Sequence, residues 1–246
     1  MSTASFTGPS GRMLSEKDLA LLVALERNGT IAWSDKEIEF NSGFLSHVYF
    51  RARNDLSHNM PLLMRVATQA KEYVAALENT HGPQKCLIGI PTAGTQFAQA
   101  IADLSYFEAS NDGYLLSRPE SLICFSTMRS VLKDHGKDNM WVGKPDLTKH
   151  THITFENVVS TAKAMLQAFG RLEEDGYPTR EMHHVVFVDW GLGGMESLAE
   201  EGYTRVHTLY EMLDIMAAFV HIGLWKQERY DEMYRRIQVW KASNKH

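Results

Sequence analysis

The feature that most constrains the fold is a pattern that recurs along the chain: a short apolar run, a turn and then a helical segment. It is clearest in KCLIGIPTAGTQFAQAIADL (85–104), where the apolar run breaks at 91–94 and resumes as a helix of small residues. Further predicted strands are SLICFSTMR (121–129), HITFENVV (152–159) and HHVVFVDW (183–190). Strands that alternate with helices are typical of a parallel sheet covered on both faces. The sequence therefore predicts an α/β fold.

Helices are also expected toward both ends of the chain. The spacing of Ser15 and Asp18 is a capping signal for an N-terminal amphipathic helix that closes at Gly29. Further helices are expected over about 61–79, about 160–175, the second half of 202–219, and 224–240. The last of these is charged and amphipathic, so it either caps the sheet or packs on a partner, and a packed surface helix is the favoured interpretation.

Composition limits the class of protein. The formal charge is −5, from 25 basic and 30 acidic residues without long runs of one sign, which makes duplex nucleic acid an unfavoured partner. No apolar stretch approaches the ~18 residues that span a bilayer, and the first ten residues lack a signal-peptide core. Cys86 and Cys124 lie in apolar runs, as thiols of a reducing compartment do. We expect a soluble, cytoplasmic protein.

One turn has chemistry of its own. Backbone amides at a strand, turn and helix junction such as 91–94 are suited to hold an anion. On physical grounds alone, an ordinary α/β connection explains that turn equally well.

Five segments together favour the anion-binding interpretation, because they resemble segments of the orotate phosphoribosyltransferases, which are type I phosphoribosyltransferases, in the same order. The resemblance spans roughly 40–216 and lies in FNSGFLSHVYFRAR (40–53), GIPTAGTQFAQAIA (89–102), MRSVLKDHG (128–136), HITFENVVSTAKAM (152–165) and VVFVDWGLGGMESLAEEGYTRVHTLYEML (185–213). It implies one domain over 1–246, a parallel sheet flanked by helices, with an N-terminal helix and small hood (1–60), a core (61–218) and a C-terminal helix (219–246).

The resemblance also implies roles for individual residues. The segment 128–136 is similar to the mobile catalytic loop of the family, with Arg129, Lys133 and His135 as catalytic cations that neutralise the leaving diphosphate. In the family this loop reaches the other subunit of a homodimer, so these residues are expected to act in trans.

The substrate-binding residues follow from the same comparison. Those expected to bind phosphoribosyl pyrophosphate, with its Mg²⁺, are Thr92, Ala93, Gly94, Thr95, Glu156, Asn157, Ser160, Thr161, Ala162 and Lys163. Those expected to bind orotate or a related base are Asn41, Ser42, Gly43, Tyr49 and Trp190. In the family, acidic residues at the positions of Glu156 and Asn157 hydrogen-bond the ribose hydroxyls. Backbone amides and hydroxyls at the start of the next helix hold the 5′-phosphate.

Several positions depart from the family pattern. Asn41, Ser130 and Trp190 replace two lysines and an arginine, Asn157 replaces an acid and Ala162 a loop glycine. The indole of Trp190 can stack on a flat base but cannot pair with a carboxylate.

The departures leave three hypotheses open. The first is family-type phosphoribosyl transfer to orotate. The second is a catalytically weak or silent paralogue that senses nucleotides or binds a partner, and the third is a transferase with a different acceptor. Lys163 and Arg51 are candidates to replace the lost charges.

Other constellations carry less weight. His150 and His152 would share one face of a strand, whereas His183 and His184 would point to opposite faces. Without paired cysteines, or histidines at zinc-ligand spacing, we expect no dedicated metal site. The glycines at 191–194 lack the spacing of a dinucleotide-binding loop, and no activated serine or cysteine motif of a covalent hydrolase is present.

Overall fold

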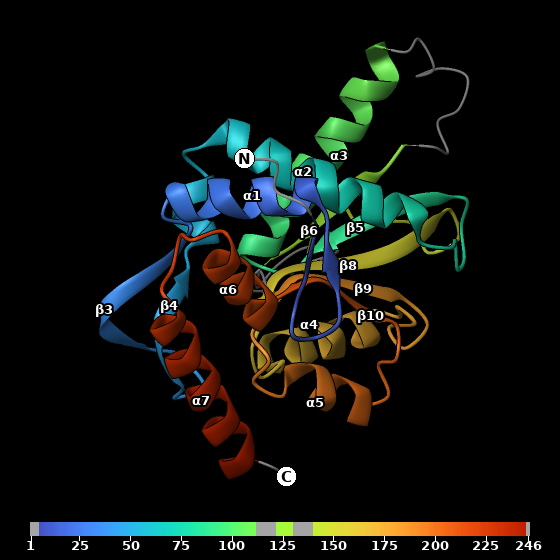
Figure 1. The fold of residues 1–246 in the computed structure, drawn as a ribbon. Coiled ribbons are helices and arrows are strands. Elements are labelled where there is room, and N and C mark those ends of the chain that lie inside the picture. Colours follow the sequence, from blue (N-terminus) through green and yellow to red (C-terminus); the bar gives the residue numbers. More distant parts are fainter. Residues whose placement is uncertain (1–4, 112–121, 130–139, 245–246) are drawn as a thin grey trace.

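The structure is a computed structural model that describes residues 5–111, 122–129 and 140–244. Its centre is a six-stranded sheet with the strand order β10-β9-β8-β5-β6-β7 (Figure 1). The strands are β5 (Gln84–Gly89), β6 (Cys124–Met128), β7 (Trp141–Val142), β8 (His150–Val159), β9 (His183–Asp189) and β10 (Val206–Glu211). All neighbours pair in parallel except β6 and β7, which are antiparallel. The predicted α/β fold is confirmed.

Helices cover both faces of the sheet (Figure 1). Side chains alternate between the faces, so Leu87 belongs to one buried cluster and Ile88 to the other. The larger cluster lies under α1 (Glu16–Arg27), α2 (Met60–Ala76), α3 (Ala93–Asn111) and α6 (Met212–His221), and the smaller under α4 (Lys163–Glu174) and α5 (Gly194–Glu200). The strand β9 is buried along its whole length, so at the centre of the sheet neither face is left to water.

Local signals place the helix ends. Ser15 and Asp18 form a reciprocal capping box at the start of α1, and Gly29 takes a left-handed conformation (φ 77°) after its end. Pro61 lies in the first turn of α2, where its missing N–H costs nothing. The helix expected from about residue 160 begins instead at Lys163, because the three preceding residues form a turn in which Ala162 is left-handed (φ 60°).

An antiparallel hairpin of β3 (Ile31–Glu39) and β4 (Leu45–Phe50) forms the hood beside the sheet (Figure 1). The strand β4 ends at Phe50, and a π-helical turn, η1 (Ala52–Leu56), follows. A hairpin of two short strands, β1 (Phe6–Thr7) and β2 (Met13–Leu14), precedes α1. No helix of the described residues is long and apolar enough to cross a bilayer.

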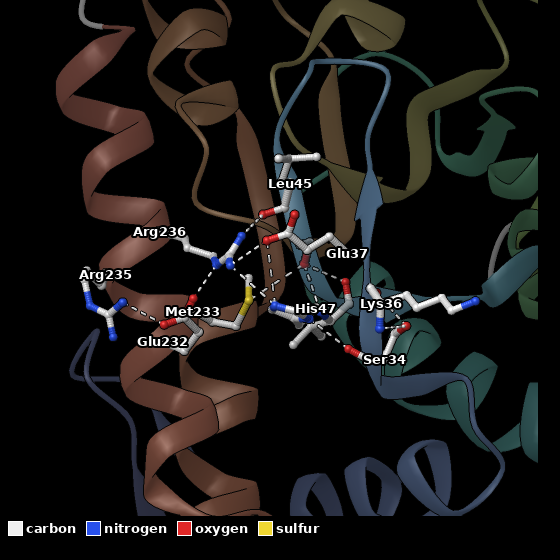
Figure 2. Close-up of polar contacts among 11 residues, drawn as sticks. Ser34, Lys36, Glu37, Leu45, His47, Glu232, Met233, Arg235 and Arg236 are labelled. Atoms are coloured by element: carbon white, nitrogen blue, oxygen red, sulfur yellow. Dashed lines mark hydrogen bonds and ion pairs between the residues drawn. The ribbon is translucent and has the colours of Figure 1, made fainter.

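The C-terminal helix α7 (Gln227–Ser243) begins three residues later than the sequence predicted and packs on the chain itself. Figure 2 shows its Arg236 reaching the hood, where the guanidinium lies 2.7 Å from Glu37 and 2.6 Å from Glu232 of its own helix. Met233 and Ile237 are its fully buried residues. The C-terminal helix was expected within 219–246, but residues 219–221 still belong to α6, which ends at His221.

Candidate functional site

Three turns meet at the carboxyl edge of the sheet. They follow β5, β8 and β9, which are adjacent strands, and they lead into α3, α4 and α5. The carboxyl ends of neighbouring parallel strands in such a fold form one crevice, which is where ligands bind in open α/β sheets. The sequence-predicted phosphate and pyrophosphate segments are therefore brought together.

Two glycines allow these turns to lie in direct contact. A Cβ on Gly94 would fall 2.2 Å from the carbonyl oxygen of Phe155, and one on Gly194 would fall 2.6 Å from that of Ser160. Neither position could carry a side chain without moving the backbone opposite. One helix start lies against β8 itself, at Phe155, and the other lies against the turn that follows β8, at Ser160, so the glycines set the spacing of the site.

The β5–α3 turn lies beside β8. Ala93 and Gly94 are buried and Thr92 is exposed, while the Thr95 hydroxyl donates to the carbonyl of Gly89 over 3.4 Å. The peptide bond between Pro91 and Thr92 is cis.

The β8–α4 turn lines a first cavity of about 460 Å³. Ser160, Thr161, Ala162 and Lys163 form one wall, with Asn41 and Ser42 of the hood opposite. Lys163 is the first residue of α4, so the unpaired amides of the helix start face the same region as a lysine side chain. This combination of amides, hydroxyls and one cation is suited to a phosphate group.

A second cavity of about 450 Å³ adjoins the first and shares Asn41, Val158 and Ser160 with it. It is lined by the hood and by the ends of β8 and β9: Glu39, Phe40, Asn41, Tyr49, Phe50, Arg51, Asn157, Val158, Ser160 and Trp190. Glu156, just before it, is 6% exposed, and its Oε1 accepts the Asn157 N–H over 2.8 Å.

The comparisons with known proteins agree on one fold. No family model matches the chain. A curated orotate phosphoribosyltransferase of Pyrobaculum aerophilum is 24% identical over 157 residues, which are 63% of this chain and 70% of that protein.

Among solved structures, the UMP synthase of Leishmania donovani matches with a TM-score of 0.68 and 16% identity, over 90% of this chain and 42% of that one. The chain thus spans less than half of that relative. The orotate phosphoribosyltransferase of Mycobacterium tuberculosis, in complex with Fe(III) dicitrate, matches with a TM-score of 0.58 and 17% identity, over 81% and 98% of the two chains.

The chain shares the fold of the orotate phosphoribosyltransferases. The resemblance drawn from five sequence segments is confirmed, as is the predicted sheet flanked by helices, which is parallel except for the pairing of β6 with β7. Three of the segments that carry the resemblance, 89–102, 152–165 and 185–213, contain the turns that meet at the carboxyl edge of the sheet.

Of the three predicted catalytic residues, the structure describes Arg129 alone. Arg129 follows β6 at the carboxyl edge, where its N–H donates to Met140 and its carbonyl accepts from Arg171 over 2.8 Å in both cases. Lys133 and His135 lie outside the described residues. Their predicted role therefore remains a prediction.

The predicted base-binding residues lie on the hood and on β9. Asn41 lines the first and second cavities, and Tyr49 lines the second. Gly43 makes the hood turn, with φ 87° and its N–H donating to Phe40 over 2.8 Å. Trp190 is only 3% exposed and packs edge to face on Phe40 at 4.9 Å, so it forms the back wall rather than an open stacking surface.

A third cavity, of about 510 Å³, shows what the sequence reasoning missed. It shares Asn41, Ser42, Thr161 and Lys163 with the first cavity, and the end of α7 closes it with Trp240, Lys241 and the following Asn244. The Trp240 indole donates to the Leu192 carbonyl over 3.2 Å, and Lys241 pairs with Glu196 at 3.0 Å. Only the amphipathic pattern of 224–240 hinted that this helix packs, and nothing in the sequence indicated where.

Asp189 also lies at this edge of the sheet, although it was not among the predicted site residues. It ends β9 beside Val159 and Glu211 of the neighbouring strands, and its Oδ1 accepts the Gly191 N–H over 2.8 Å. Burial, with smaller repulsion from Glu196 and Glu211, raises the pKa of this carboxyl to about 6. The match of its segment to the family was a usable signal.

Four histidines of β8 and β9 contact other aromatic rings. His150 and His152 lie on one face, with ring centroids 6.0 Å apart, whereas His183 contacts His207 and His184 packs on Phe169 across the sheet. His184 bonds Thr154 and the Thr179 carbonyl, and burial lowers its pKa to about 4. Within the described ranges no cluster of three or more His, Cys, Asp or Glu could hold a metal ion.

Proposed function

We propose that this chain transfers the phosphoribosyl group of phosphoribosyl pyrophosphate to orotate or a related base and releases pyrophosphate, a step in pyrimidine nucleotide biosynthesis. The observation that carries the proposal is the β8–α4 turn, where helix-start amides, two hydroxyls and Lys163 face a cavity between sheet and hood. The second cavity continues from it and offers room for a planar base. One ligand can therefore reach from phosphate site to base site.

In this proposal the β8–α4 turn holds the 5′-phosphate and the end of β8 holds the ribose. Ser160 and Thr161 donate hydroxyl hydrogen bonds, and Lys163 adds a charge-assisted contact worth about 1.5 to 3 kcal/mol. Glu156 is the carboxylate nearest this turn in sequence and faces the ribose hydroxyls together with Asn157. The β5–α3 turn, Thr92 to Thr95, holds the pyrophosphate.

Transfer breaks the bond between ribose C1 and the pyrophosphate oxygen, which leaves with the bonding electrons. The ring nitrogen of the base then bonds to C1 and loses its proton. Positive groups near the departing oxygens stabilise this charge, and Arg129, Lys133 and His135 are proposed for that role. Mg²⁺ would arrive with phosphoribosyl pyrophosphate, as part of the substrate.

Two further elements belong to the proposal. The loop that carries Lys133 and His135 would act in the site of a second copy of the chain, so we propose a homodimer. The setting would be cytoplasmic, where phosphoribosyl pyrophosphate and free bases are small soluble substrates. Neither nucleic acid nor a membrane is needed for this reaction.

A second candidate function is a weak or silent paralogue that senses nucleotides. Two observations favour it. Ala162 holds a left-handed conformation that costs a residue with a side chain about 1 to 2 kcal/mol, and the buried indole of Trp190 provides no charge to the base site.

The test is to mix the purified protein with phosphoribosyl pyrophosphate, Mg²⁺ and orotate, and to measure orotate consumption together with pyrophosphate release. Lys133→Ala and Lys163→Met should each lower turnover at least tenfold, whereas Arg235→Gln, an exposed cation of α7, should leave it unchanged. Binding of phosphoribosyl pyrophosphate without turnover of any base would instead establish the sensing function. Absence of both binding and turnover would refute both functions.

A further inference from the structure

The second cavity is lined by one cation, Arg51, which the sequence had offered as a replacement for the lost charges. We propose that Arg51, a residue outside the predicted site set, is the group that binds the negatively charged substituent of the acceptor base. The inference rests on the proposed function and deepens it, since it names the residue that recognises the base.

Arg51 stands immediately after β4, on the hood side of the cavity. Its backbone N–H donates to the Thr30 carbonyl over 2.7 Å, which fixes the start of the side chain, while the residue itself is exposed. The guanidinium carbon lies 5.4 Å from the ring centre of Tyr49, a cation–π distance. Tyr49 thus contacts the guanidinium beside the cavity that both residues line.

The charge of Arg51 is available to a ligand. Among the residues that line this cavity, it is the only one with a positive charge, and no carboxylate of the described residues forms an ion pair with it. A planar guanidinium binds a carboxylate through two parallel hydrogen bonds, which a lysine or an indole cannot do. Trp190, at the back of the same cavity, offers only an apolar surface.

The other residues that line the cavity further define which base can bind there. Glu39 is the one acid in the lining, and it can accept from a ring N–H, while Asn41 and Asn157 provide amides that both donate and accept. Phe40 and Trp190, packed edge to face, form the apolar part of the lining. A pyrimidine with an acidic substituent and free ring N–H groups satisfies all of these, whereas an uncharged pyrimidine leaves Arg51 without a partner.

The experiment measures binding rather than turnover. Wild-type protein, Arg51→Gln, Arg51→Lys and the control Arg235→Gln are titrated by calorimetry with orotate, with uracil as its uncharged counterpart, and with phosphoribosyl pyrophosphate. Base titrations are made with phosphoribosyl pyrophosphate present and Mg²⁺ omitted. Arg51 is exposed, so its variants should fold, and circular dichroism checks that they do.

We expect the wild type to bind orotate more tightly than uracil, and Arg51→Gln to weaken orotate binding about 10- to 100-fold without changing uracil binding. Arg51→Lys should recover part of the loss, and the affinity for phosphoribosyl pyrophosphate should not change. An unchanged preference for orotate in Arg51→Gln would overturn the inference, as would a loss confined to phosphoribosyl pyrophosphate.

The two proposals fail separately. Orotate binding that depends on Arg51, without pyrophosphate release in the turnover assay, would keep this inference and refute the transferase. Pyrophosphate release with uracil but not with orotate would do the reverse.

Discussion

Replacing Gly194 by alanine tests whether the close contact between two turns forms the phosphate site. A Cβ there would lie 2.6 Å from the Ser160 carbonyl oxygen, 2.8 Å from Val159 Cγ2 and 3.0 Å from the Ala162 nitrogen, whereas ordinary contact begins near 3.4 Å. Two of these three atoms are backbone, so the β8–α4 turn itself must move by about 0.8 Å at the carbonyl. A rotamer change cannot relieve the overlap.

The magnitude follows from overpacking, which costs about 1 to 3 kcal/mol and, in a chain of this size, lowers the melting temperature by about 2 to 12 °C. Gly170→Ala is the matched control, because Gly170 lies inside α4 with open space around its Cβ position. There alanine should stabilise the protein by about 0.5 to 1 kcal/mol, through helix propensity.

The assay is thermal unfolding with and without ribose 5-phosphate, which should raise the melting temperature of the wild type and of Gly170→Ala by binding the folded state. Gly194→Ala should melt lower and lose most of that rise. If Gly194→Ala keeps both the wild-type melting temperature and the full ligand-induced rise, the contact does not form the phosphate site and our reasoning fails.

Three further predictions concern the same edge of the sheet. Ala162→Gly should raise the free energy of unfolding by about 1 kcal/mol, because glycine adopts φ 60° without strain; denaturant unfolding measures this, and a loss of stability would contradict it. Asp189 has a pKa of about 6 in the folded protein and 3.8 ordinarily, so the wild type loses stability as the pH rises from 4 to 6. Over that interval the free energy of unfolding of Asp189→Asn should rise by about 2 to 3 kcal/mol relative to the wild type. A difference between the two proteins that does not depend on pH would disprove the shift. Trp240→Phe removes the hydrogen bond to Leu192 and should cost about 0.5 to 1.5 kcal/mol in the same assay, with an unchanged midpoint as the opposing result.

Much of the candidate site could be predicted because its residues follow predicted strands. Ser160 and Thr161 come directly after β8, and Thr92 to Thr95 come directly after β5, so identifying two neighbouring parallel strands placed both turns at one edge. The helix start was misplaced by three residues, since a left-handed alanine is rare and its sequence signal is normally glycine.

Other parts of the site depend on contacts between distant positions. The strand β7 has only two residues and exists because Trp141 and Val142 pair with β6, a pairing without local periodicity. Trp190 is buried in part because Phe40, 150 positions away in the sequence, packs on its ring. The sequence offered Arg51 as a replacement cation, but only the structure showed that it lines the same cavity as Trp190.

The sequence by itself determined the alternation of strands and helices, the capping of α1 and the order of the segments that carry the family resemblance, because each depends on residues a few positions apart. Only the tertiary structure decided that hood, sheet edge and α7 enclose adjoining cavities, with Asn41, Ser160 and Lys241 around them. The physical reason is range: hydrogen-bonded turns and apolar periodicity act over a few residues, whereas a cavity forms from whichever surfaces the packing of the whole chain brings together.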